Sequence, residues 1–201
     1  TSTTQGASVS VFDTWESSPF RTGKLKGNIK VIDNPFKVVD EITGNGNQSD
    51  KVLAFQRSRF GSSTFGARVE LAKPLALTPK TQYVHVKIYT PKAEKIMLFA
   101  LGKRADRADQ SKDVVQVEAN CISSIKANKW CDAVFAISSA PGVNIHSFLI
   151  IPDLHSTHNL AQDFAVYVDD IEVNNTSMPS IQYGVCLLYT SDAADDRISV
   201  D

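Results

Sequence analysis

The sequence contains about ten short runs of apolar, β-branched and aromatic residues, separated by turn residues at fairly even spacing. This pattern limits the folds open to the chain more than any other feature does. The clearest run is 83–89, in which Val84, Val86 and Ile88 alternate with aromatic and polar residues. Residues that alternate in this way lie on opposite faces of a strand. The sequence contains no convincing amphipathic helix. The pattern therefore predicts an all-β protein, a two-sheet antiparallel β-sandwich of the jelly-roll type with about ten strands.

We expect strands at residues 8–12, 29–32, 51–57, 65–71, 83–89, 95–101, 114–118, 130–137, 145–151 and 164–173. The run at 65–71 is expected to end before Pro74, because proline has no N–H group to donate to a sheet. Strand–helix alternation is absent, which argues against a parallel α/β sheet.

The chain is expected to hold one domain. Residues 1–7 are typical of a linker, residues 8–177 form the sandwich, and residues 178–201 are a non-native or disordered tail. From Cys186 the sequence Cys-Leu-Leu-Tyr-Thr-Ser-Asp-Ala-Ala-Asp-Asp resembles a translated adapter of sequencing libraries, which indicates a metagenome-derived gene with read-through at 186–201. The remaining length of about 185 residues suits one β-sandwich.

The charge of the chain is close to balanced. The formal net charge is −1, and it becomes +2 without the four Asp and one Arg of the tail. Neither value indicates nucleic acid or an anionic membrane as a partner. No apolar run approaches the ~18 residues that would span a bilayer.

Two cysteines remain once the tail is set aside. Cys121 and Cys131 flank a hairpin and could face each other across it. Their spacing fits a disulfide in an oxidising compartment, but it equally fits two unlinked buried thiols. The sequence leaves both alternatives open.

The last expected strand, Phe-Ala-Val-Tyr-Val-Asp-Asp-Ile-Glu-Val, carries an acidic pair inside an apolar run. By simple alternation Asp170 and Glu172 share one face and Asp169 takes the other. A carboxylate that is buried in a strand must be paired, hydrogen-bonded or bound to a metal.

This closing strand, together with Gln-Tyr-Val-His-Val-Lys-Ile at 82–88, resembles strands of jelly-roll carbohydrate-binding modules of secreted, Bacteroidetes-like polysaccharide-degrading proteins. The resemblance implies a non-catalytic module that binds polysaccharide and keeps an attached catalytic domain near its substrate. It also implies a monomer in a secreted, periplasmic or cell-surface location. A structural calcium ion would join the first and last strands, with Asp13 or Glu16 facing Asp169 or Asp170.

Sugar binding needs aromatic rings for the C–H faces of a pyranose and polar groups for its hydroxyls. The expected ligand-binding residues are Tyr83, His85 and Tyr89 on one strand face, Arg57 and Gln116 if their strands neighbour that of Tyr89, Trp15 if it is exposed, and Arg104 for acidic sugars. The alternatives are half-buried sheet packing for the tyrosines, a core position for Trp15 and an internally ion-paired loop around Arg104.

Catalysis is the less favoured alternative. Arg68-Val-Glu-Leu71 and Gln82-Tyr-Val-His85 are similar to motifs of β-sandwich polysaccharide lyases, but the second is one residue too long and a tyrosine-rich motif is missing. Glycoside hydrolases need two carboxylates across a cleft. Asp170 and Glu172 share an expected face at the end of a strand instead. A third alternative is a structural or protein-interaction sandwich, because fold alone does not fix function.

Overall fold

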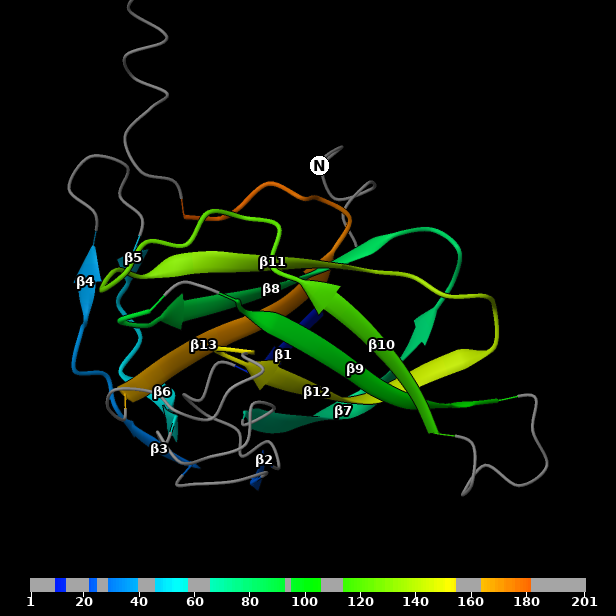
Figure 1. Ribbon diagram of the computed structural model, residues 1–201, viewed down its shortest axis with the longest axis horizontal. Coiled ribbons are helices and arrows are strands. Elements are labelled where there is room, and N and C mark those ends of the chain that lie inside the picture. The colour runs from blue at the N-terminus through cyan, green and yellow to red at the C-terminus, as the bar shows by residue number, and fades with distance from the viewer. Residues whose placement is uncertain are drawn as a thin grey trace, which may run out of the picture.

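The strands of the computed structural model form a sandwich of two antiparallel sheets (Figure 1). The structure describes residues 10–13, 22–24, 29–39, 46–57, 66–92, 95–105, 114–154 and 164–181. The predicted all-β jelly-roll sandwich is confirmed. Within the described ranges, no helix is long and apolar enough to cross a membrane.

Sheet A has the strand order β11-β8-β13-β6-β3, and β1 pairs with β13 beside that path. Its strands are β1 (Ser10–Asp13), β3 (Ile29–Asp33), β6 (Lys51–Arg57), β8 (Gln82–Tyr89), β11 (Cys131–Ile137) and β13 (Phe164–Asn174). Sheet B has the order β10-β9-β12-β7-β2. Its strands are β2 (Thr22–Lys24), β7 (Ala67–Leu77), β9 (Met97–Arg104), β10 (Val114–Asn120) and β12 (Val143–Ile151). A small hairpin of β4 (Val38–Val39) and β5 (Gly46–Asn47) lies at one end of the molecule (Figure 1).

The core lies between the two sheets and is built from the inward half of each alternating strand. Val84, Val86 and Ile88 of β8 are fully buried, as their alternation predicts. They belong to one apolar cluster with Phe135 of β11 and Phe148 of β12. Burial of such side chains contributes about 1.5–3 kcal/mol each. Both sheets therefore have defined inner faces, and their outer faces remain for function.

Strand β7 runs through Pro74 to Leu77, so the expected end of this strand before Pro74 is wrong. Its partner β12 explains the difference. Glu70 pairs with Ser147 and Leu75 pairs with Ile145, so the intervening residues of β7 lie opposite a single residue of β12. Proline is tolerated at such an irregularity, because the ladder is already interrupted there.

Cys121 and Cys131 are free thiols, and the N–H of Lys126 donates to Sγ of Cys131 over 3.2 Å.

Ile181 is buried against Val52 and Trp130. Packing on the sandwich thus continues to Ile181, beyond the expected domain end at residue 177.

Candidate functional site

The outer face of β8 carries Tyr83, His85 and Tyr89, but Tyr89 does not form an open platform. Its ring is stacked on that of Phe36, with centroids 4.0 Å apart and planes 7° apart. The ring of Trp130 lies edge-on at 5.6 Å from Tyr89, and that of Tyr167 at 6.1 Å. Phe36 therefore takes the ring face on which a sugar would stack. We call Phe36, Tyr89, Trp130 and Tyr167 the aromatic cluster.

His85 is 4% exposed and holds the segment that follows β13. Its Nδ1 lies 2.7 Å from Oδ2 of Asp132, and its Nε2 lies 2.8 Å from both Oδ1 of Asn174 and the carbonyl oxygen of Thr176. Burial alone would lower the pKa of His85, but the bond and charge of Asp132 and the contacts at Nε2 raise it above its ordinary value. The N–H of Ser180 also donates to Oδ2 of Asp132 over 2.7 Å. The buried imidazole is thus committed to protein partners.

A bulge in β13 sets the direction of its acidic residues. Asp169 pairs with Lys87 and Glu172 pairs with His85, so β13 has one residue more than β8 between these pairs. Asp170 lies in this bulge, with a φ of 46°, and its carboxylate contacts Nζ of Lys87 at 2.8 Å. The extra residue resets the alternation and brings all three carboxylates to the outer side of sheet A. The expectation that Asp169 takes the opposite face is wrong.

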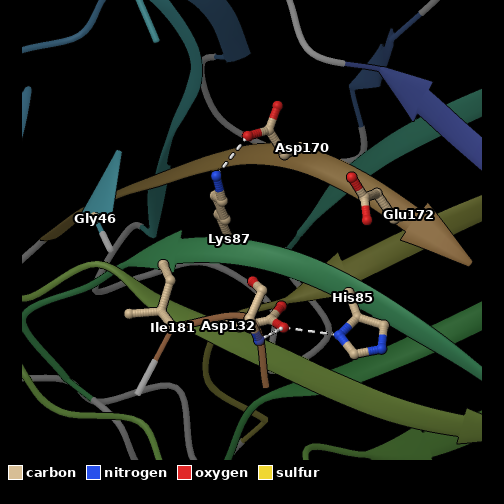
Figure 2. Close-up of a pocket in the computed structure, with 8 residues that line it drawn as sticks. Gly46, His85, Lys87, Asp132, Asp170, Glu172 and Ile181 are labelled. Carbon is tan, nitrogen blue, oxygen red and sulfur yellow. Dashed lines mark hydrogen bonds and ion pairs between the residues drawn. The ribbon is translucent and has the colours of Figure 1, made fainter. Parts of the chain in front are cut away.

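These groups surround a pocket of about 170 Å³, which we call the polar pocket. Its walls include His85, Lys87, Asp132, Glu172, Ser180 and Ile181. Figure 2 shows Lys87 and Asp170 turned toward each other, with the carboxylate of Glu172 nearby. Burial and the charge of Asp170 raise the pKa of Glu172.

Asp169 fits the calcium ion that the resemblance implies better than Asp170 does. It is fully buried, and burial raises its pKa to about 7, although bonds from Ser49 and Asn47 oppose this. Nδ2 of Asn47 donates to Oδ2 of Asp169 over 3.0 Å, whereas Oδ1 has no hydrogen-bond partner within the described ranges. Carboxylate oxygens suit calcium. The carboxylate of Asp170, by contrast, pairs with Lys87.

The first and last strands lie side by side, as that expectation requires. The backbone of Asp13 on β1 pairs with Ile171 on β13, one residue beyond Asp170. The side chain of Asp13, and Glu16 altogether, lie outside the described residues.

The outer face of sheet B carries a larger groove of about 510 Å³. Three neighbouring strands line it: β7 with Arg68, Glu70 and Leu71, β9 with Leu101, Gly102 and Lys103, and β12 with His146 and Ser147. The Ser147 side chain is 1% exposed, and its Oγ has no hydrogen-bond partner among the described residues. A buried hydroxyl without a partner is costly. The groove thus combines cationic, imidazole and apolar groups with one unsatisfied donor.

The other predicted binding residues are spread over both sheets. Gln116 is exposed on β10 of sheet B, where its Nε2 donates to Oε1 of Glu118 over 2.9 Å. Arg104 ends β9 in the same sheet. Arg57 ends β6, which is separated from β8 by β13, and its side chain lies outside the described residues, as does Trp15. The fold therefore does not bring Gln116 and Arg57 beside Tyr89.

Sequence reasoning named His85 and Asp170, which line the polar pocket, as candidate site residues, but it missed the other residues that line the two depressions. Arg68 entered only as part of a lyase-like motif, and His146 and Ser147 were read as an ordinary strand segment. The signal at His146 was its polar side chain inside the apolar run 145–151, next to a second polar residue, which breaks the alternation and is typical of a bulge. Asp132 gave a similar signal, because it stands alone inside the apolar strand β11.

No protein-family model matches the chain, and no curated protein matches its sequence. Solved structures do match. One contains the CBM22-1 and GH10 modules of Clostridium thermocellum xylanase 10B with xylohexaose, at a TM-score of 0.53 and 14% identity, covering 87% of this chain and 29% of that one. Another is the CBM22-1 xylan-binding domain of Paenibacillus barcinonensis Xyn10C, at a TM-score of 0.50 and 12% identity, covering 84% of this chain and 94% of that one.

A third match is the tandem CBM22-1–CBM22-2 domain of the same Paenibacillus protein, at a TM-score of 0.51 and 14% identity, covering 83% of this chain and 49% of that one. The chain therefore spans under a third of the Clostridium chain but nearly the whole length of a single binding module. At such low identity these likenesses concern the fold. The chain has the two-sheet β-sandwich fold of these carbohydrate-binding modules.

Proposed function

We propose that this domain binds a polysaccharide along the groove of sheet B and does not cleave it. The observation that carries the proposal is the unpartnered hydroxyl of Ser147 inside a groove that crosses three strands. The hydroxyls of a glycan would satisfy it, since a hydroxyl both donates and accepts hydrogen bonds. The solved modules of the same fold include a xylan-binding domain and a complex with xylohexaose, which supports this class of ligand.

The lining of the groove provides both kinds of contact that a sugar chain needs. Leu71 and Leu101 offer apolar surface to the C–H faces of the rings, while Arg68, Lys103 and His146 offer hydrogen-bond donors. Arg68 and Lys103 outnumber the one carboxylate of Glu70 in the groove, which favours a polymer that carries carboxylate groups. We therefore expect acidic polymers to bind better than neutral ones of the same backbone.

Binding without cleavage is the better-supported alternative for this groove. Among its described lining residues the carboxylates are limited to Glu70, whereas most glycoside hydrolases use two. Attached to a catalytic domain, such a module would raise the local concentration of substrate for its partner. We further propose a secreted, periplasmic or cell-surface setting, which fits extracellular polymers, and a calcium ion held by Asp169.

Affinity gel electrophoresis against xylan, pectin, mannan, β-glucan and alginate tests the proposal. At least one polymer should retard the domain, and Arg68→Ala and His146→Ala should each remove most of that retardation. The matched control is Lys80→Ala, which removes an exposed charge from the turn between β7 and β8. If no polymer retards the domain, a structural or protein-interaction role replaces binding. Release of reducing ends or unsaturated products would identify an enzyme.

A further inference from the structure

A second depression, the polar pocket on sheet A, is independent of the groove because it lies on the other sheet. We propose that it is a separate site for one sugar ring, held by hydroxyl contacts to Glu172 and Asp132. The ligand class follows from the groups of the pocket itself, so the inference goes beyond the proposed function of the groove.

The first reason is an unsatisfied buried acceptor. Asp132 is 1% exposed, and its Oδ2 accepts from Ser180 and contacts His85. Its Oδ1 has no hydrogen-bond partner among the described residues. An unsatisfied buried oxygen on a charged group costs at least about 1–3 kcal/mol. A ligand that donates a hydrogen bond to Oδ1 would remove this cost.

The second reason is the carboxylate of Glu172, which offers further hydrogen-bond acceptors to the pocket. Glu172 is half-buried on the pocket wall, and burial and the charge of Asp170 raise its pKa. The charges of His85 and Lys87 offset this rise only in part. The two acceptors come from β11 and β13, which lie on either side of β8. They therefore flank the pocket rather than adjoin each other along one strand (Figure 2).

The mixture of groups favours a neutral ligand over a metal ion. The pocket has three carboxylates, and two cations nearly balance their charge. The carboxylates are those of Asp132, Asp170 and Glu172. The cations are Lys87 and His85, which is charged when both of its nitrogens face acceptors. In the described part of the chain, no three His, Cys, Asp or Glu side chains come together as a metal site would need. Lys87 and the Ser180 hydroxyl supply donors, whereas Glu172 and Asp132 supply acceptors. A hydroxyl group can accept from these donors and donate to these acceptors.

The size limits the ligand to one ring. The pocket holds about 170 Å³, well below the ~300 Å³ at which sites for drug-sized ligands begin. Ile181, which is mostly buried, provides an apolar wall. A polymer would therefore enter by its end rather than pass through, and a free monosaccharide would present the same hydroxyls.

The test is an amide NMR titration of the intact chain with glucose, galactose, mannose, xylose and N-acetylglucosamine. At least one sugar should give saturable shifts at Gly46, Lys87 and Ser180. Glu172→Gln should weaken that binding about tenfold, the loss expected for a hydrogen bond to a charged acceptor. Glu118→Gln, an equal change on the exposed face of β10, should leave it unaltered. Ser180→Ala provides a milder second variant on the pocket wall.

Several results would overturn the site. They are the absence of saturable shifts with every sugar, equal affinity of Glu172→Gln and the unaltered chain, or shifts with methylammonium or calcium but with no sugar. Loss of the same shifts in Arg68→Ala would assign the binding to the groove instead. Conversely, pocket shifts that persist in Arg68→Ala while polymer retardation is lost would separate the two sites. Tighter binding of an oligosaccharide than of its monomer would identify the chain end as the source.

Discussion

Nδ1 of His85 lies 2.7 Å from Oδ2 of Asp132 on the adjacent strand, and both side chains are almost fully buried. Removing one partner of such a buried charge pair destabilises the fold by about 3–5 kcal/mol, because the other charge is left uncompensated. Oδ2 of Asp132 also accepts from the N–H of Ser180. The pair therefore links β8 and β11 to the segment after β13.

We predict that His85→Gln lowers the free energy of unfolding by about 3 kcal/mol at pH 6 and by less at alkaline pH. The pKa of His85 is raised in the folded protein, so its contribution is fully present below the unfolded value of about 6.5 and is lost as pH rises through the folded value. Urea unfolding across pH 5.5–9 measures this. A stability gap between the two proteins that stays constant over the range would contradict the role of the imidazolium.

The strands could be predicted from the sequence because their signal is local. Val84, Val86 and Ile88 alternate with polar neighbours, and burial on one face follows directly from that period. The end of β7 could not be predicted, because Pro74 lies among extra residues of β7 that face a single residue of its partner β12. Register between strands is a tertiary property that no single run reveals.

The candidate sites were harder to predict for the same reason. The bulge at Asp170 carries a positive φ on a residue other than glycine, so the printed sequence gives no warning that the alternation resets there. Tyr89 was correctly placed on the outer face, but Phe36, which covers it, belongs to a distant loop. Segments that are distant in the sequence can cover an outward-facing ring, and they then decide whether a ligand can contact it.

Asp169→Asn should change stability in opposite directions with and without calcium. In the presence of a chelator at pH 8 the variant should be more stable by about 2 kcal/mol, because burial raises the pKa of Asp169 to about 7 and its charged form is disfavoured in the fold. With millimolar calcium the unaltered chain should be the more stable one, since an ion bound to the folded state adds its binding energy. Thermal unfolding of both proteins in the two buffers measures these stability differences. Asp33→Asn, at an exposed carboxylate, is the control.

If calcium leaves the unfolding temperature of the unaltered chain unchanged, Asp169 holds no ion. Stabilisation of the variant in chelator at pH 8 would still report the cost of the buried carboxylate. That gain should shrink as pH falls below about 7, where Asp169 is protonated in the folded protein.

Gly102→Ala should destabilise the sandwich by about 2–3 kcal/mol, the cost of forcing atoms into a packed site. A Cβ at Gly102 would lie 2.0 Å from the carbonyl oxygen of Asn144 on β12, which pairs with β9 there. Gly142→Ala is the comparison, because open space surrounds that position and its φ of +96° alone opposes a side chain. Chemical denaturation should rank Gly102→Ala as the more damaging change. Equal or reversed effects would show that β9 and β12 can separate at the groove.

Tyr89→Ala should cost stability without weakening polysaccharide binding. The ring is stacked on Phe36 and contacts the edge of Trp130, so its removal leaves a cavity in the aromatic cluster and should cost about 3–5 kcal/mol. Trp130 is 1% exposed, and its fluorescence should shift to the red as water reaches it. Gel retardation at a temperature where the variant is still folded should match that of the unaltered chain. Loss of retardation by a folded Tyr89→Ala, with Arg68→Ala unaffected, would return the sugar site to β8 and remove it from the groove.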